Sequence, residues 1–500
     1  MRTSSTIGHV LDHAVSQAPN SPAVEAVSGI WSYRELDEQA HRAAGALWAL
    51  GVRPGDRVAA CLPNDLDIVA AFHGAARIGA IWAGIGEALS AAEQADLSEL
   101  CEPAVVLAGD RCRIAGGIFS DHWKQLIAEA DAAPDIAIDP DAPAGIAFTS
   151  GTSGRPKAVV HSHRNLLLPG AVLGESRGWG SDLRKGDSFP LTILNLMVLS
   201  TLLTAQAGGC AVIMDRRDLD GVVEWITSRR VTVWNGAPAQ LYDLARRPDI
   251  DLGALEEVWS GGSDTSDALR QEFSAAHGLI PRATYGLTEA PTVVSIDPPG
   301  REWRPRASGV VLPHLDVAAY DDNDVRLPAG ELGELKLAGR ADGEFADAWR
   351  PMLGYWDRGL HPTVDDLIAT GDVGTVDAGG WLTVVDRKKL VIIRGGANVY
   401  PLEVERVIAT DPRVGRVAVY PLPDDRLGQR VAAVIESGGE AVDFDHLADL
   451  CRRELAGYKV PEVWSRIDTL PVNAMGKVLR ANLADVVAGG AEEVVHVRRR

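Results

Sequence analysis

The sequence predicts an α/β protein with doubly wound, mixed sheets in a large N-terminal part and a smaller C-terminal section. Helical and strand patterns alternate from about residue 31 to residue 280, which is typical of mainly parallel sheets covered by helices on both faces. From about residue 310, short strands lie between turn signals such as DDND and DAGG, which indicates antiparallel pairing. A second α/β section starts near residue 390, so we expect a domain boundary between residues 386 and 390.

Individual elements follow from local patterns. Residues 32–50 are predicted to form an amphipathic helix, because Ser32 is a suitable N-cap and Gly51 follows the last helical residue. A buried strand at residues 57–63 and a helix at residues 67–80 come next. Further strands are predicted at residues 104–109, 209–215, 232–237, 315–321, 333–339, 381–386, 417–424 and 430–438, with a helical pattern at 447–457.

Composition narrows the class of protein. A length of 500 residues suggests about three folded units, and a net charge of −20 argues against a nucleic-acid-binding surface. Five scattered cysteines without a CxxC pair predict a reducing, cytoplasmic location without a zinc or disulfide framework. The N-terminus lacks the apolar core of a signal peptide. Residues 193–214 carry no charge, but polar residues and a Gly-Gly pair interrupt them, which favours a helix and a buried strand over a membrane span.

The stretch TSGTSGRPK at residues 149–157 has the composition of a phosphate-binding loop. Such a loop can direct backbone N–H groups and hydroxyls at phosphate oxygens, and lysine adds a positive charge. It does not match the Walker A pattern, because Pro156 and Ala158 replace the required glycine and hydroxyl residue, and because a strand rather than a helix follows. A flexible surface loop is the alternative interpretation of this stretch alone.

Residues 148–166, FTSGTSGRPKAVVHSHRNL, resemble the phosphate loop of the adenylate-forming superfamily, which comprises acyl-CoA synthetases, peptide-synthetase adenylation domains and beetle luciferases. Further motifs follow in the expected order: GGS at 261–263, ATYGLTEA at 283–290, TGDVG at 370–374, DRKKLVIIRGGANVYPLEVE at 386–405 and PVNAMGKVLRANL at 471–483. The chain is most similar to an acyl-CoA synthetase. The resemblance implies an N-terminal domain at 1–386 with a small antiparallel barrel over about 310–386, a hinge at 387–390 and a mobile α+β C-terminal domain at 391–500.

The resemblance also implies a site for ATP and Mg²⁺. Tyr285 would present its ring to adenine, while Asp372 and Arg387 would hold the ribose. The catalytic residues would be Thr288 near the α-phosphate, Glu289 as the Mg²⁺ ligand, and Lys477 between the substrate carboxylate and the α-phosphate. The remaining implied nucleotide contacts are Thr149, Ser150, Gly151, Thr152, Ser153, Gly154, Lys157, Gly262, Ser263 and Gly286.

An acid pocket and a CoA channel are implied in the same way. The pocket would be lined by Leu191, Asn195, Asn235, Gly236, Gly261 and Gly262. Residues 189–198 lack the histidine frequent in acyl-CoA synthetases, which bears on substrate orientation, and the aspartate that amino-acid-activating members use. We therefore expect a bulky, apolar carboxylic acid without an α-amino group. Gly395 and Gly396 would admit the pantetheine arm beside the backbone, and Lys389 would be the hinge.

The expected reaction is ATP-dependent acyl-AMP formation followed by thioester formation with CoA, releasing AMP and pyrophosphate. Three alternatives stay open: a stand-alone adenylation enzyme that loads an acyl carrier protein, a nucleotide- or acyl-AMP-binding paralogue with impaired catalysis, and a luciferase-type oxygenase. His161 and His163 would share one face of a strand, where packing or capping is favoured over zinc binding. We expect neither a nucleic-acid partner nor a membrane span, and the oligomeric state is left open.

Overall fold

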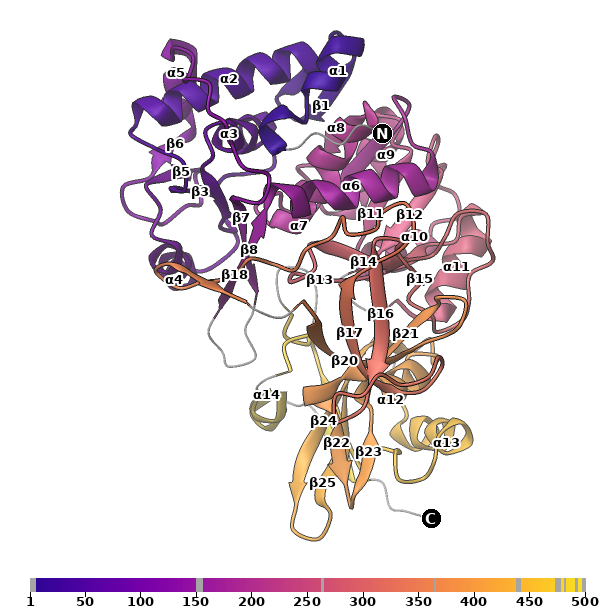
Figure 1. The fold of residues 1–500 in the computed structure, drawn as a ribbon. Helices are drawn as coiled ribbons and strands as arrows, with labels where there is room; N and C mark the ends of the chain where they lie inside the picture. Colours follow the sequence, from indigo (N-terminus) through magenta and orange to yellow (C-terminus); the bar gives the residue numbers. More distant parts are fainter. Residues whose placement is uncertain are drawn as a thin grey trace.

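The computed structural model describes residues 6–149, 156–261, 265–363, 366–437, 442–472, 478–480, 483–490 and 493–496. Figure 1 shows two large α/β units in the N-terminal part and a smaller lobe, which carries the C-terminal strands and helices, at the opposite end of the molecule. The predicted fold class, a large N-terminal domain with mixed sheets and a smaller C-terminal domain, is therefore confirmed.

The first large sheet has eight strands in the order β19-β18-β8-β7-β4-β3-β5-β6. Its inner strands from β7 to β6 pair in parallel, while β8, β18 and β19 are antiparallel. The helix predicted from residue 32 is confirmed as α2 (Tyr33–Ala49), and Ser32 forms the full capping box with Glu35. The other elements are β3 (Arg57–Cys61), α3 (Leu66–Arg77), β4 (Ile81–Gly84), α4 (Ala91–Cys101), β5 (Val105–Ala108), β6 (Ile118–Phe119), α5 (Ser120–Glu129), β7 (Pro143–Thr149), β8 (Lys157–Ser162), β18 (Gly354–Trp356) and β19 (Leu360–Pro362).

The second large sheet has nine strands in the order β15-β14-β13-β12-β11-β9-β10-β1-β2. The six strands from β13 to β1 are parallel, so their carboxyl ends lie along one edge. Ligands of open α/β sheets bind at such an edge. The elements are η1 (Ile7–His9), α1 (Asp12–Gln17), β1 (Pro22–Ala26), β2 (Gly29–Ser32), α6 (His163–Arg177), β9 (Arg184–Asp187), β10 (Cys210–Ile213), α9 (Leu219–Ser228), β11 (Val233–Gly236), α10 (Pro238–Ala245), β12 (Glu257–Ser260), α11 (Asp267–His277), β13 (Arg282–Leu287), β14 (Thr292–Ile296) and β15 (Val310–Val311).

The uncharged stretch at residues 193–214 is a helix and a strand, as predicted. It contains α7 (Leu194–Met197), a π-helical turn η2 (Val198–Leu202), α8 (Leu203–Ala207) and then β10, and the helix ends at Gly208 with φ +74°. A left-handed glycine is the usual way to end a helix. Within the described part of the chain, no helix combines the length and apolarity needed to cross a membrane.

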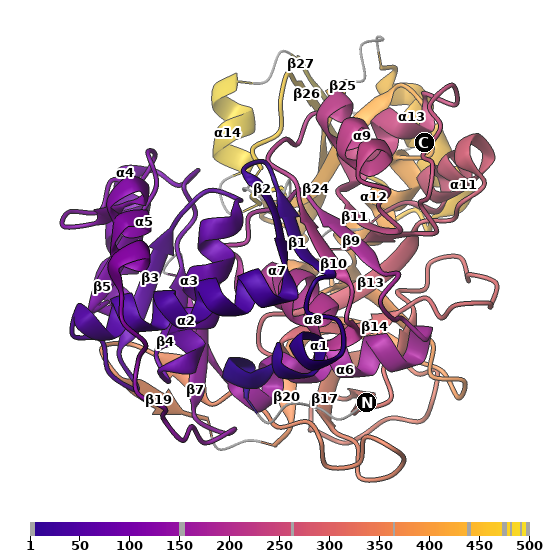
Figure 2. The ribbon, with the colours of Figure 1, turned by 90° about the horizontal axis from the view of Figure 1, so that it is seen from above.

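The antiparallel part and the C-terminal lobe complete the fold. The region predicted to form a small antiparallel barrel contains a four-stranded antiparallel sheet in the order β16-β17-β20-β21, and the C-terminal lobe is built on a six-stranded sheet. Figure 2 shows the helix α14 and the strands β26 and β27 of this lobe on one side of the molecule. The elements are β16 (Leu315–Tyr320), β17 (Gly333–Gly339), β20 (Ile368–Val376), β21 (Leu382–Arg387), η3 (Lys388–Leu390), β22 (Ile392–Arg394), β23 (Ala397–Val399), α12 (Pro401–Ile408), β24 (Val414–Asp424), β25 (Gly428–Ser437), α13 (Phe444–Glu454), β26 (Val463–Ile467), α14 (Leu483–Gly490) and β27 (Glu493–His496).

Helix α6 packs against both large α/β units and thereby fixes their relative position. Leu166 and Leu167 belong to the core cluster of the first unit, which includes β3 and α3 residues. Leu168 and Val172 belong to the cluster that joins the second sheet to the four-stranded sheet. One amphipathic face could not serve both clusters, which explains why α6 is buried on nearly every side.

Candidate active site

The carboxyl edge of the second sheet gathers the predicted acid-pocket residues. Asn235 and Gly236 end β11, and Gly261 follows the last residue of β12. A β-carbon on Gly261 would collide with the Thr284 side chain of the next strand, so the close approach of β12 and β13 requires glycine there. Leu191 is fully buried in the core cluster of the first unit, and Asn195 is half-buried in α7.

Three of the predicted nucleotide residues lie in direct contact. The Tyr285 hydroxyl donates a hydrogen bond to Asp372 Oδ2 over 2.7 Å, and Arg387 Nε lies 3.1 Å from Asp372 Oδ1. Arg387 reaches Asp372 because the two residues are paired partners on β20 and β21. The Asp372 side chain is 4% exposed and the Arg387 side chain 49% exposed, so the group lies at the surface with its carboxylate shielded.

The surroundings of Tyr285 keep its hydroxyl protonated beside the negatively charged Asp372. Burial, followed by the negative charge of Asp372, raises the pKa of Tyr285 well above its ordinary value, so the phenol stays protonated and acts as a donor. Each carboxylate oxygen of Asp372 can accept a second hydrogen bond beside its protein partner. The carboxylate can therefore accept hydroxyl groups of a ligand while Tyr285 and Arg387 hold it in place.

The turn after β13 carries Thr288 and Glu289 and is tied to the first sheet. His161 Nε2, on β8, donates a hydrogen bond to the Thr288 carbonyl oxygen over 2.7 Å. Burial lowers the pKa of His161 to about 4, so the ring is neutral near pH 7 and carries its proton on Nε2. This bond ties the Thr288 backbone to β8, the strand that follows the phosphate loop. It thereby helps to position Thr288 and Glu289, the predicted phosphate and metal contacts.

Lys157 and Glu289 both lie near one tyrosine that the sequence did not single out. The Lys157 ammonium lies 4.9 Å from the centre of the Tyr355 ring, within cation–π range. Burial and the charge of Glu289 both raise the pKa of the Tyr355 hydroxyl. Tyr355 occupies β18, where it pairs with Val159 of β8. Tyr355 is therefore close enough to interact with both the predicted phosphate-binding lysine and the predicted metal ligand.

The structure describes the two ends of the predicted phosphate loop but not its middle. Thr149 and Lys157 are paired partners at the adjoining ends of β7 and β8, so they mark where the loop begins and ends. The remaining predicted residues outside the description are Ser150, Gly151, Thr152, Ser153, Gly154, Gly262, Ser263 and Lys477. Their predicted contacts stay predictions.

The predicted hinge region joins the four-stranded sheet to the C-terminal lobe. Lys389 is the central residue of η3, and Gly395 and Gly396 have φ values of +58° and +85° in the turn between β22 and β23. Two consecutive left-handed residues are typical of a tight hairpin turn. Asp386, just before η3, accepts hydrogen bonds from the backbone N–H groups of Arg387 and Leu402, over 2.7 and 2.6 Å.

Two expectations about metals and histidines can be compared with the structure. Among the described residues, no cluster of three or more His, Cys, Asp or Glu side chains could hold a metal ion. A Mg²⁺ ion bound through Glu289 would instead need phosphate oxygens and water as its other ligands, which is the usual composition of such sites. The expectation that His161 and His163 share a strand face is wrong, because His163 begins α6.

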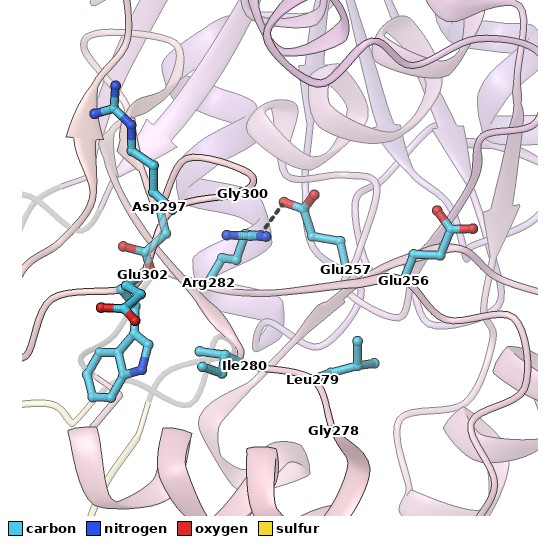
Figure 3. A pocket seen from close by; sticks show the side chains of 11 residues that line it. Glu256, Glu257, Gly278, Leu279, Ile280, Arg282, Asp297, Gly300 and Glu302 are labelled. Atoms are coloured by element: carbon cyan, nitrogen blue, oxygen red, sulfur yellow. Dashed lines mark ion pairs between the residues drawn. The ribbon is translucent and has the colours of Figure 1, made fainter.

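Figure 3 shows a separate cleft of about 580 Å³ at the amino-terminal ends of β12 and β13. Its buried charges are paired within the protein: Arg282 lies 3.3 Å from Glu257, and Asp297 contacts Arg270. It includes none of the predicted site residues. The lining residues are Glu256, Glu257, Gly278, Leu279, Ile280, Arg282, Asp297, Gly300, Arg301, Glu302 and Trp303.

Comparison with known proteins identifies the family. The AMP-binding enzyme family matches residues 11–356, and the C-terminal domain of AMP-binding enzymes matches residues 403–477. A feruloyl-CoA synthase from an Amycolatopsis species is 31% identical over 490 residues, which cover 93% of this chain and 96% of that protein. The long-chain-fatty-acid–CoA ligase FadD13 of Mycobacterium tuberculosis is 30% identical over 511 residues, covering 96% and 98% of the two chains.

The solved structures agree with this result. The crystal structure of ATP-bound MatB from Rhodopseudomonas palustris has a TM-score of 0.85 and 26% identity, and the match covers 95% of this chain and 98% of that one. The chain therefore belongs to the AMP-binding enzyme family. Within that family its activity is that of an AMP-forming acyl-CoA synthetase, which uses ATP to ligate a carboxylic acid to CoA.

Proposed function

We propose that the enzyme activates a bulky, mostly apolar carboxylic acid without an α-amino group, in two half-reactions at one site. The pocket positions after β9, β11 and β12 are dominated by apolar and small residues, and apolar linings with few polar groups bind apolar ligands. Segment 189–198 contains no acidic side chain that could pair with an α-ammonium group. These features support a substrate acid whose apolar part binds by burial against the apolar lining of the pocket.

In the first half-reaction a carboxylate oxygen attacks the α-phosphorus of ATP, and pyrophosphate leaves as the bond to the β-phosphate oxygen breaks. Asp372 and Arg387 hold the ribose beside Tyr285, and Lys477 offsets the negative charge that develops at the α-phosphorus. The loop bounded by Thr149 and Lys157 holds the β- and γ-phosphates. Mg²⁺ held by Glu289 neutralises phosphate charge when bound.

In the second half-reaction the CoA thiolate attacks the acyl carbon, the bond to AMP breaks, and AMP leaves with the electron pair. We propose that the C-terminal lobe turns about Lys389 between the two steps. This movement withdraws the Lys477 loop and brings the Gly395–Gly396 turn to the site, where the absence of side chains leaves room for a pantetheine arm. The five cysteines, all free and buried, fit an enzyme of the reducing cytoplasm.

The observation that carries this proposal is the contact of Tyr285 with Asp372 and Arg387. These residues come from two different sheets and from three of the motifs, yet they share one carboxylate. A structural salt bridge needs no tyrosine donor on the second carboxylate oxygen, whereas a ribose site needs a carboxylate whose orientation is fixed.

A panel of carboxylic acids, tested for AMP release that needs ATP and either CoA or a holo-acyl carrier protein, identifies the substrate and the acceptor. Lys477→Ala should slow acyl-AMP formation by about 100-fold or more, while thioester formation from supplied acyl-AMP continues at a near-normal rate. Equal losses in both half-reactions would contradict the role of Lys477. Nucleotide binding without AMP release for any acid would favour a paralogue with impaired catalysis.

A further inference from the structure

One face of β8 is directed at the turn that carries the predicted phosphate and metal contacts. Successive side chains of a strand alternate between its two faces, so Lys157, Val159 and His161 share one face. His161, towards the far end of the strand, donates its hydrogen bond to the Thr288 carbonyl oxygen. Lys157, at the start of the strand, therefore leaves the sheet on the side on which Thr288 and Glu289 lie.

Tyr355 lies beside Lys157 on this face. It pairs with Val159 across the antiparallel ladder of β8 and β18, and paired residues project from the same face. Lys157 is two positions from Val159, which makes it a diagonal neighbour of Tyr355 within reach of a long side chain. The Lys157 ammonium accordingly lies 4.9 Å from the centre of the Tyr355 ring, a cation–π distance. The strand register and the measured distance agree on this contact.

An aromatic ring suits a lysine that has to bind an anionic ligand. In the part of the chain that the structure describes, the Lys157 ammonium forms no ion pair with a carboxylate. A carboxylate partner would offset the positive charge and occupy at least one of the N–H donors. The face of a ring attracts the charge through its quadrupole and leaves the N–H donors available. Lys157 is exposed and its side chain is flexible, so the contact with the ring also restricts its conformations.

We infer that Tyr355 positions Lys157 for the terminal phosphates of ATP, because its ring holds the ammonium on the side of Thr288 and Glu289. This inference deepens the proposed function and rests on it, since the proposed function assigns Lys157 to the β- and γ-phosphates. Tyr355 is a positioning residue that acts through Lys157. The same contact serves pyrophosphate, the product of the first half-reaction, whereas AMP has neither phosphate and binds without it.

Calorimetric titration in the absence of any carboxylic acid measures the affinities for Mg-ATP and AMP separately, since no acyl-AMP can form. Tyr355→Leu removes the ring and should weaken ATP binding by about two- to fivefold, the size of an exposed cation–π contact, while the AMP affinity keeps its wild-type value. Tyr355→Phe keeps a ring face and should bind ATP as the wild type does. In a Lys157→Ala background, Tyr355→Leu should cause no further loss, because the two residues act as one unit.

Trp356→Leu is the matched control. Trp356 is the next residue of β18 and also makes a cation–π contact, but with Arg57, whose Cζ lies 5.0 Å from the centre of its ring. It pairs with Ala158 and packs on the opposite face of the sheet from Tyr355. The substitution removes a larger ring from the same strand, so it perturbs β18 at least as much as Tyr355→Leu. It should leave the ATP affinity at the wild-type value.

The possible results separate this inference from the proposed function. The inference is overturned by an unchanged ATP affinity in Tyr355→Leu, by equal losses of ATP and AMP affinity, or by a loss in Tyr355→Phe as large as that in Tyr355→Leu. In each of these cases the ligase function stands. A wild-type enzyme that binds neither nucleotide, or a Lys157→Ala variant that binds ATP normally, would instead contradict the proposed function on which the inference rests.

Discussion

Removal of the His161 side chain should slow acyl-AMP formation, because this imidazole joins the two large sheets at the proposed nucleotide site. A lost hydrogen bond between neutral groups costs about 0.5–1.5 kcal/mol, and a carbonyl left without a donor in a buried place costs about 1–3 kcal/mol. His161 is fully buried and its bond to the Thr288 carbonyl is 2.7 Å long, so the larger figure applies. If that energy positions Thr288 and Glu289 in the transition state, the first half-reaction slows by about 5- to 150-fold.

The assay measures pyrophosphate release with the preferred acid, and separately thioester formation from supplied acyl-AMP. His161→Ala should slow the first and spare the second. His161→Gln should recover much of the loss, because an amide N–H can replace the donor. His163→Ala is the control: this histidine is equally buried and also has a pKa of about 4, but it accepts a bond from the Ile7 N–H instead. Equal effects of His161→Ala and His163→Ala on the first half-reaction would refute the positioning role.

The remaining predictions test the proposed ribose site, the acid pocket and the loss of folding stability at acidic pH. Tyr285→Phe keeps the ring but removes the donor to Asp372, so the KM for ATP should rise by about tenfold, as measured by initial rates; an unchanged KM would remove the hydroxyl from the ribose site. Gly261→Ala should impair acid activation, because its β-carbon collides with Thr284 Oγ1, and Thr284→Ala in the same chain should restore part of the activity by removing that oxygen; no recovery would contradict this cause. Burial lowers the pKa values of four histidines to about 3 or 4, so the unfolded chain binds more protons below pH 6.5, and stability should fall from there towards pH 4. Urea denaturation should show that the free energy of unfolding falls by about 1.4 kcal/mol per pH unit for each histidine. In His314→Leu it should fall less steeply with pH.

Local patterns predicted the elements and the motifs, but they did not reveal the contacts between sheets. Ser32 and the alternation after it are short-range signals, and α2 begins where they indicate. Lys185 and Asp187 lie in a short Lys-Gly-Asp stretch that looks like a polar turn by composition. It is a buried strand because β10 and β11 flank it on both sides, and strand order is not encoded in the local pattern.

The same limit applies to His161 and Tyr355. Both lie near the predicted nucleotide residues only because β8 meets β18 on one side and the turn after β13 on the other. Their partners are distant in sequence: His161 and Thr288 are separated by 127 positions. A histidine in a strand is ordinary in sequence, and its role follows from which carbonyl the fold brings within reach.

The proposed turn of the C-terminal lobe about Lys389 would change the contacts at the junction between the lobes. Asp386 belongs to β21, whereas Leu402, whose N–H it accepts, belongs to α12 of the C-terminal lobe. A turn about Lys389 would break this bond, at a cost of about 1–3 kcal/mol for a charged acceptor. A second polar contact across the junction joins Arg406 and the Val384 carbonyl oxygen, at 3.4 Å. Differences of that size are what substrate binding can reverse, since a ligand shifts an equilibrium by its differential affinity for the two states. In the proposed movement, differential affinity of acyl-AMP and CoA for the two arrangements would offset the loss of these contacts.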